Sequence, residues 1–252
     1  MARIARKFIL AETNHVMLRG IGHLELFLHD EDYHVFQRTL SRVKTEEGVV
    51  ILAYCLMDNH VHLLLQGRPE VIPHFLQRVE VRYALYYNRV YEHVGHLFQN
   101  RYRSQAVRDD RYFLNALRYI LHNPEQAGLC RWETYPWSSA QSYLTGANDG
   151  VTETSRACIL LGGRATLCSF LGSAGDGAEC MIDEPGFPKR GYSDADAVKI
   201  TRRACGLKHP NQIGELDRDA RMQALAKLKK EGLTIRQLER ITGLNRNMIQ
   251  RA

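Results

Sequence analysis

Strand-like and helix-like patterns of apolar residues alternate along the first 145 residues. Runs rich in β-forming residues predict four strands, over 15–20, 49–57, 60–66 and 104–107. Only Asp58 and Asn59 separate the second run from the third, and this pair favours a tight hairpin turn. These two strands are therefore expected to pair antiparallel.

Apolar residues recur at helical spacing in three longer segments, over 30–49, 71–91 and 109–123. The first segment carries acidic residues in its opening turn, which suit a helix N-terminus. Pro124 is expected to stop or kink the third segment. Helices packed on hairpin-linked strands predict an α+β sandwich with a central antiparallel sheet and flanking helices.

A second region begins near residue 146, where glycines accumulate together with Asp and Ser. This composition predicts a linker over 146–192 with one short helix near 158–170. From residue 193 to residue 252 the pattern becomes helical and basic. We therefore expect a sandwich domain over 1–145, a linker, and a small all-α module over 193–252.

Charge is distributed unevenly along the chain. The net charge is +6, and residues 196–252 alone carry 13 basic against 6 acidic residues. Such a concentration suits a polyanion such as nucleic acid, although a solvated helical surface carries similar charge. No apolar run approaches the roughly 20 residues of a membrane-spanning helix, and the apolar stretch at the start is too short for a signal peptide. Six cysteines without a CxxC pair favour reduced thiols over a zinc site, so a cytoplasmic protein is expected.

Two histidines, His60 and His62, flank Val61 within the predicted strand over 60–66. Because strand side chains alternate, both imidazoles are expected on one face of the sheet. Two imidazoles held together on a rigid strand suit one divalent metal ion. Taken alone, the pattern also fits two histidines that simply pack on a sheet.

Tyr119 and Asn123 stand four residues apart in the predicted helix over 109–123 and so share one helical face. A tyrosine hydroxyl can act as a nucleophile, and an amide oxygen can bind a hard metal ion. Together with the two histidines, these residues would form a metal-assisted phosphoryl-transfer site. The chain has 12 tyrosines, so residue type alone does not single out Tyr119.

Five motifs follow one another over the first 145 residues: HVMLRG (15–20), AYCLMDNHVHLLL (53–65), GHLFQNRYRS (95–104), RYILHNPEQAGL (118–129) and YPWSS (135–139). In this order they resemble the single-tyrosine HUH transposases, and most closely the REP-associated tyrosine transposases, relatives of insertion-sequence transposases. The resemblance covers about residues 8–145. It implies that the α+β sandwich is of the HUH type.

The resemblance also implies residue roles. His60 and His62 would be the HUH pair, with Asn123 as third ligand to Mg²⁺ or Mn²⁺, and Tyr119 would be the nucleophile that forms a 5′-phosphotyrosine link. The insertion-sequence relatives usually have Gln as third ligand, so Asn123 agrees better with the REP-associated branch. The rival nucleophiles by type are Tyr86, Tyr87, Tyr102 and Tyr112, and none shares the helix-and-Asn context. The general base stays open among His122, a lysine and water.

Several arginines lie within or beside these motifs and can bind phosphate through the planar guanidinium group: Arg19, Arg82, Arg101, Arg103 and Arg118. Tyr102, between two of them, can stack on an unpaired base. For any single residue, a basic surface with an inward-packed aromatic ring is an equal alternative. As a set, these residues favour DNA.

Residues 234–252 read as a helix, a turn at Gly243 and a second helix. This resembles the helix-turn-helix of bacterial replication initiators, although Glu239 occupies a position that is usually small. The candidates for base or phosphate contacts in the second helix are Asn245, Arg246, Asn247 and Arg251. A plain helical hairpin is the alternative, and the basic charge of the segment favours DNA.

We therefore expect a metal-dependent single-stranded DNA endonuclease and strand transferase that cleaves at or near hairpin-forming repeats. It would be cytoplasmic, associated with the nucleoid, and monomeric or homodimeric, with duplex DNA as a possible second partner of the C-terminal module. One alternative is a catalytically idle DNA-binding regulator, against which the intact set of His60, His62, Tyr119 and Asn123 argues. A second alternative is a replication or mobilisation nickase.

Overall fold

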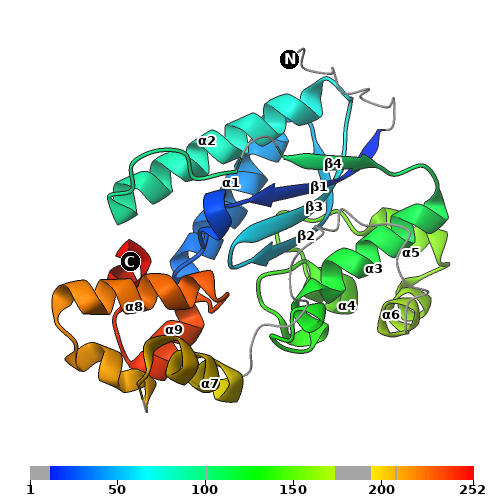
Figure 1. Cartoon of the computed structure of the whole chain (residues 1–252). Helices are drawn as coiled ribbons and strands as arrows, with labels where there is room; N and C mark the ends of the chain where they lie inside the picture. The colour runs from blue at the N-terminus through cyan, green and yellow to red at the C-terminus, as the bar shows by residue number, and fades with distance from the viewer. Residues whose placement is uncertain (1–11, 100–101, 174–193, 208) are drawn as a thin grey trace, which may run out of the picture. The chain divides into compact units, whose positions relative to one another are not determined.

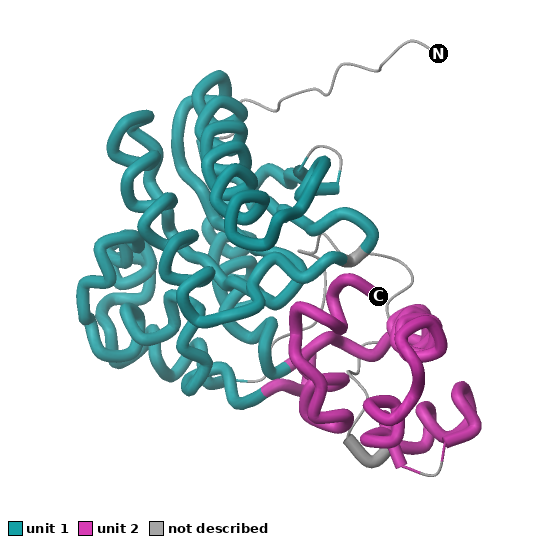
Figure 2. Tube along the Cα trace, turned by 90° about the vertical axis from the view of Figure 1, so that its left-hand side faces the viewer, with its two compact units in different colours: residues 1–125, 130–185 teal, residues 126–129, 186–252 magenta. Residues whose placement is uncertain are grey.

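The computed structural model describes residues 12–99, 102–173, 194–207 and 209–252. The chain divides into two compact units, one formed by residues 1–125 and 130–185 and the other by residues 126–129 and 186–252 (Figure 2).

The first unit contains a four-stranded antiparallel sheet (Figure 1). Its strands are β1 (Thr13–Arg19), β2 (Val50–Met57), β3 (His60–Gln66) and β4 (Arg103–Ala106), in the order β2-β3-β1-β4. β2 and β3 form the hairpin that Asp58 and Asn59 predicted. All four strands predicted from the sequence are therefore present, with ends shifted by one or two residues.

Long helices cover the two faces of this sheet (Figure 1). α1 (Asp30–Glu47) and α2 (Val71–Tyr91) pack against each other, and Gln37 of α1 donates a hydrogen bond of 3.0 Å to the Tyr54 hydroxyl on β2. α3 (Asp110–Gln126) covers the opposite face, which carries His60 and His62. The predicted α+β sandwich with flanking helices is confirmed.

Pro124 lies inside α3 and does not stop the helix at residue 123. Proline removes the hydrogen bond from its own nitrogen to the carbonyl group four residues earlier. Because α3 ends two residues later, at Gln126, the helix loses that bond only in its last turn. Asn123 therefore remains helical and stays in register with Tyr119.

The motif at 135–139 covers the outer edge of the sheet beside β2. The Leu56 amide donates to the carbonyl oxygen of Trp137 at 2.9 Å, and the Ser139 amide donates to that of Tyr54 at 3.0 Å. The short helix η2 (Trp132–Thr134) precedes this segment and α4 (Ala140–Thr145) follows it. The segment satisfies backbone groups that an edge strand would otherwise expose.

Residues 146–173 are more ordered than the predicted linker with one short helix. They contain two helices, α5 (Ser155–Leu160) and α6 (Arg164–Gly172), and Thr152 forms a parallel bridge with Ile51 of β2. Apolar positions explain the difference, since Ala157, Leu167 and Leu171 are buried in the first unit. The glycines serve as turns, as at Gly162 with φ of 71°. The remainder of the predicted linker, residues 174–192, lies outside the described residues.

The second unit is helical. It comprises α7 (Asp194–Cys205), η3 (Pro210–Glu215), α8 (Arg218–Lys230), α9 (Ile235–Thr242) and α10 (Arg246–Arg251). Leu225, Leu228, Leu238 and Ile249 are fully buried and form part of its core. None of the helices described in either unit is long and apolar enough to span a membrane.

Candidate nuclease site

The sheet register places several polar side chains on the face that α3 covers. β1 pairs Arg19 with His60, Met17 with His62 and His15 with Leu64, while β4 pairs Arg103 with Met17. Residues directly opposite each other on neighbouring strands share one face of a sheet. The face beneath α3 therefore carries His15, Arg19, His60, His62 and Arg103.

His60 lies between two amide side chains. Its Nε2 atom is 3.3 Å from Oδ1 of Asn123, and its Nδ1 atom is 2.8 Å from Oδ1 of Asn59. Asn123 is only 7% exposed and projects from α3 towards β3. The structure thus brings together the strand histidine and the helix asparagine that the sequence predicted as metal ligands.

His62 lies beside the predicted nucleophile. The ring centroids of His62 and Tyr119 are 5.6 Å apart with the planes perpendicular, and those of His60 and His62 are 5.1 Å apart. The Nδ1 atom of His62 lies 3.0 Å from the Nε2 atom of His15. His15 also touches Tyr119, with ring centroids 5.9 Å apart.

Burial controls the charge of both histidines. The pKa of His60 is lowered to about 4, mainly by desolvation; the hydrogen bond to Asn123 opposes this shift, and the charge of Arg19 contributes to it. Desolvation also lowers the pKa of His62 well below its ordinary value, with His60 and His15 acting in the same direction. Both rings are therefore neutral near pH 7, which is the form that binds a metal ion.

The donor set fits a divalent cation. Two neutral imidazoles and one amide oxygen converge from β3 and α3, and these ligand types suit Mn²⁺ or Mg²⁺ with open coordination positions. Within the described ranges there is no cluster of three or more His, Cys, Asp or Glu side chains arranged to hold a metal ion. A metal ion at this site would therefore depend on the amide oxygen of Asn123.

Two arginines border the site on the same sheet face. Burial and the nearby charge of Arg103 lower the pKa of Arg19 to about 10, so Arg19 is still charged near pH 7.

Gly20 follows Arg19 in the chain, and a Cβ atom at this position would lie 2.0 Å from the carbonyl oxygen of Leu24. Glycine is thus required where the chain leaves β1 beside His60.

Three other predicted DNA contacts lie elsewhere in the first unit. Arg82 pairs with Glu46 at 3.0 Å, between α2 and α1 on the opposite side of the sheet from the histidines, and its role in DNA binding stays a prediction. Arg118 stands over the Phe170 ring of α6 at 4.6 Å. Tyr102 is only 5% exposed, so in this conformation its ring is packed inside and cannot stack on a base, contrary to the prediction. Arg101 lies outside the described residues.

The rival tyrosines lack the surroundings of Tyr119. The hydroxyl groups of Tyr86 and Tyr87 donate to Asp32 and to the carbonyl oxygen of Glu25, beside α1 and the loop before it. Tyr112 is half-buried near the start of α3, two turns from Tyr119. His122, a candidate general base, stacks on Trp132 and bonds the carbonyl oxygen of Leu171 at 2.8 Å. This contact occupies its Nε2 atom on another side of α3.

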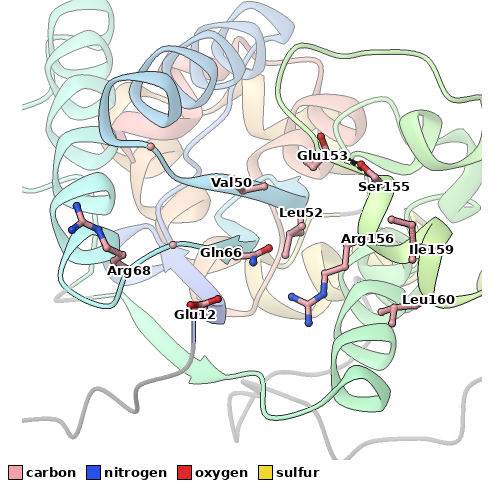
Figure 3. A pocket seen from close by; sticks show the side chains of 12 residues that line it. Glu12, Val50, Leu52, Gln66, Arg68, Glu153, Ser155, Arg156, Ile159 and Leu160 are labelled. Carbon is pink, nitrogen blue, oxygen red and sulfur yellow. Dashed lines mark hydrogen bonds between the residues drawn. The ribbon is translucent and has the colours of Figure 1, made fainter.

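A cavity of about 620 Å³ opens at the far end of the hairpin (Figure 3). Gln66 and Arg68 line it from the β3 side, and Arg156 and Ile159 line it from α5. Gln66 and His60 occupy opposite ends of β3, which places them roughly 20 Å apart at strand spacing. This cavity is therefore distinct from the site formed by the histidines.

In the second unit, α9 and α10 are joined by a tight turn in which Gly243 has φ of 71°. Glu239 forms an ion pair with Arg246, which explains the charged residue at a position that is usually small. The Asn245 side chain caps α10 by accepting from the Asn247 amide at 2.8 Å. Arg246 and Asn245 thus have partners within these two helices. The side chains of Asn247 and Arg251 are exposed.

The sequence pattern does not indicate two residues that contact the histidine pair, His15 and Asn59. His15 belongs to the first motif and Asn59 directly precedes the HUH pair, but neither position has a spacing that indicates its contact. A signal was available in the register, since a strand antiparallel to β3 brings one of its alternate residues beside His62.

Comparison with known proteins finds a family model and solved structures that are similar to this chain. Residues 13–123 match the model of the IS200-like transposase family. A solved structure of a REP-associated tyrosine transposase bound to a REP hairpin aligns with 75% of this chain and 100% of its own, at a TM-score of 0.55 and 15% identity. A putative transposase from Deinococcus radiodurans R1 aligns with 47% of this chain and 95% of its own, at a TM-score of 0.34 and 22% identity.

A search of curated proteins found no significant match. The family match ends at Asn123, the predicted third ligand, and so spans both histidines and Tyr119. The structural match extends the shared α+β fold beyond it. Residues 13–123 are therefore similar to the IS200-like transposase family, and the chain shares the HUH-type fold of a REP-associated tyrosine transposase.

Proposed function

We propose that this transposase is a metal-dependent single-stranded DNA endonuclease and strand transferase that uses Tyr119 as its only nucleophile. The observation that carries the proposal is the convergence of Tyr119, His60, His62 and Asn123 at one face of the sheet. A DNA-binding regulator would not need this combination of a phenol, two neutral imidazoles and an amide.

In the proposed reaction the Tyr119 oxygen attacks a phosphorus atom of the DNA backbone. The bond between phosphorus and the Tyr119 oxygen forms while the bond between phosphorus and the 3′-oxygen breaks, which leaves a 5′-phosphotyrosine link. The phenol proton passes to solvent or a bound base, and the departing 3′-oxygen takes up a proton. The link conserves the phosphodiester, so a 3′-hydroxyl group can reverse the step and join strands without ATP.

The chain contributes mainly by positioning charge and reactants. His60, His62 and Asn123 would hold the Mg²⁺ or Mn²⁺ ion, which, when bound, supplies Lewis acidity and a template for the scissile phosphate. Arg19 and Arg103 lie on the same sheet face and are placed to neutralise phosphate charge. α3 is a rigid helix and holds Tyr119 in fixed relation to Asn123, one turn away.

We further propose a hairpin-forming repeat as the DNA partner. The REP-associated transposase with the same fold was solved bound to a REP hairpin. The five sequence motifs of the REP-associated branch and the third ligand Asn123 favour the same class of substrate.

A second DNA contact is proposed for the helical unit. α9 and α10 have the helix, glycine turn and helix arrangement that places a second helix in the major groove. The basic charge of residues 196–252 supports binding to duplex DNA.

The test uses end-labelled single-stranded oligonucleotides that contain hairpins from repeats flanking the gene. With Mg²⁺ or Mn²⁺, the full chain is expected to cleave the hairpin strand and to leave a covalent protein–DNA band on a denaturing gel. EDTA and a scrambled strand of equal length serve as controls. Cleavage that persists in EDTA would contradict the metal dependence, and hairpin binding without cleavage would favour a regulator.

A further inference from the structure

Both HUH histidines are held through the same ring atom. Nδ1 of His60 lies 2.8 Å from Oδ1 of Asn59, and Nδ1 of His62 lies 3.0 Å from Nε2 of His15. Each contact leaves Nε2 of the HUH ring as the nitrogen away from that partner. For His60 this atom points towards Oδ1 of Asn123.

The contact with Asn59 fixes the tautomer of His60. A neutral imidazole carries one N–H group, and an amide oxygen can only accept a hydrogen bond. Both ring nitrogens of His60 face an amide oxygen, and the contact of Nδ1 with Asn59 (2.8 Å) is shorter than that of Nε2 with Asn123 (3.3 Å). The shorter contact assigns the proton to Nδ1, and Nε2 then keeps the lone pair that a metal ion requires. Asn59 belongs to the β2–β3 turn, whose backbone the Gly20 amide anchors by donating to the Asn59 carbonyl oxygen at 2.9 Å.

The contact between His15 and His62 has one donor and one acceptor. A ligand role for Nε2 of His62 requires the proton on Nδ1, which then donates to Nε2 of His15. His15 must accept at Nε2 and carry its own proton on Nδ1. His15 is completely buried on β1 between β3 and β4, so its ring cannot swing away from His62.

We infer that His15 and Asn59 are positioning residues of the metal centre, which fix the HUH imidazoles as Nδ1–H tautomers with Nε2 presented to the ion. The inference rests on the proposed metal-dependent function. Partners of this kind orient metal-bound histidines, and their loss typically weakens metal affinity by about 10- to 100-fold. Burying a polar imidazole also costs free energy unless the ring is hydrogen-bonded. A residue at position 15 that served only for packing would not need a polar ring.

The test is Mn²⁺ binding by the full chain without DNA, followed by the electron paramagnetic resonance signal of free Mn²⁺. His15→Leu and Asn59→Ala each remove an acceptor and are expected to weaken binding by about 10- to 100-fold. His15→Gln and Asn59→Asp keep an acceptor oxygen near the same place and are expected to restore binding. Gln105→Ala is the matched control, because Gln105 lies opposite His15 in the β1–β4 ladder and touches neither HUH ring in any described contact.

The outcomes separate this inference from the proposed function. Wild-type protein that binds no Mn²⁺ would overturn the metal centre itself. Wild-type binding that His15→Leu and Asn59→Ala leave unchanged, or losses that His15→Gln and Asn59→Asp fail to restore, would overturn the positioning roles alone. Long-range ¹⁵N NMR of the wild type needs no variant, and an Nε2–H tautomer for either HUH histidine would also contradict the inference.

Discussion

The Nε2 atom of His60 lies 3.3 Å from the Oδ1 atom of Asn123, although 63 residues separate them along the chain. The first residue comes from β3 and the second from the last turn but one of α3. Their contact joins the strand half of the site to the helix half. Tyr119, one turn before Asn123, is thereby placed over His62.

Replacing Asn123 tests whether its amide oxygen is a metal ligand. Asn123→Leu has a similar volume but no oxygen, and it is expected to weaken Mn²⁺ binding by about 100-fold or more. Loss of a residue that only hydrogen-bonds a metal ligand already weakens binding by up to about 100-fold. Titration with Mn²⁺ measures the effect. Asn123→Gln keeps the oxygen and is the control, expected to retain more affinity than Asn123→Leu. Equal binding by both variants would remove Asn123 from the ligand set.

The two sheet-face arginines are expected to bind the DNA backbone. Arg103→Ala should weaken single-strand binding and reduce the slope of log affinity against log salt by roughly 0.7, the value for one lost phosphate contact. Fluorescence anisotropy over a salt series measures both quantities. Arg82→Ala is the matched control, because Arg82 pairs with Glu46 on the other side of the sheet. A salt slope that changes only in Arg82→Ala would reverse this assignment.

Acid should destabilise the metal-free protein before its carboxylates titrate. Burial lowers the pKa of His60 from 6.5 to about 4, so between these values the unfolded imidazole binds a proton and the folded one does not. The free energy of unfolding is therefore expected to fall as pH drops through this window, by at most about 1.4 kcal/mol per pH unit for each such group. Urea unfolding at a series of pH values measures the slope, and His60→Gln should flatten it. Stability that rises on acidification would contradict this reading.

Asn245 and Asn247 of the helical unit, which are separated by one residue, are expected to differ in role. Asn245→Ala removes the cap of α10 and should cost about 1 kcal/mol in unfolding free energy. Asn247→Ala should leave unfolding unchanged and weaken binding to duplex DNA, since its side chain is exposed. Chemical denaturation and duplex titration of both variants measure the two effects. Unchanged duplex affinity in Asn247→Ala would count against the proposed contact.

Patterns among neighbouring residues predict most of the helices and strands of the first unit. Alternation, helical spacing and the Asp58–Asn59 turn are properties of neighbouring residues, and they predict every strand and long helix of the sandwich. The same holds for His60 and His62 on a strand and for Tyr119 and Asn123 on a helix.

The remaining features depend on packing between distant segments. Arg82 and Arg103 are both arginines within or beside the motifs. Only the packing of helices on the sheet shows that Arg103 lies on the histidine face and Arg82 on the other side. Tyr102 lies between two arginines in the sequence, yet its ring is packed inside. The contact of His15 with His62 depends on strand register, and the helices within 146–173 form because a few apolar residues find a surface to pack on.

The identity of the nucleophile is the most direct test of the proposed mechanism. Wild type, Tyr119→Phe and Tyr112→Phe would be incubated with a labelled hairpin strand and Mn²⁺, and the covalent product digested for peptide mass spectrometry. We predict a nucleotide adduct on Tyr119 in the wild type and in Tyr112→Phe, and no adduct in Tyr119→Phe despite unchanged strand binding. An adduct that survives in Tyr119→Phe, or that maps to another tyrosine, would contradict the account.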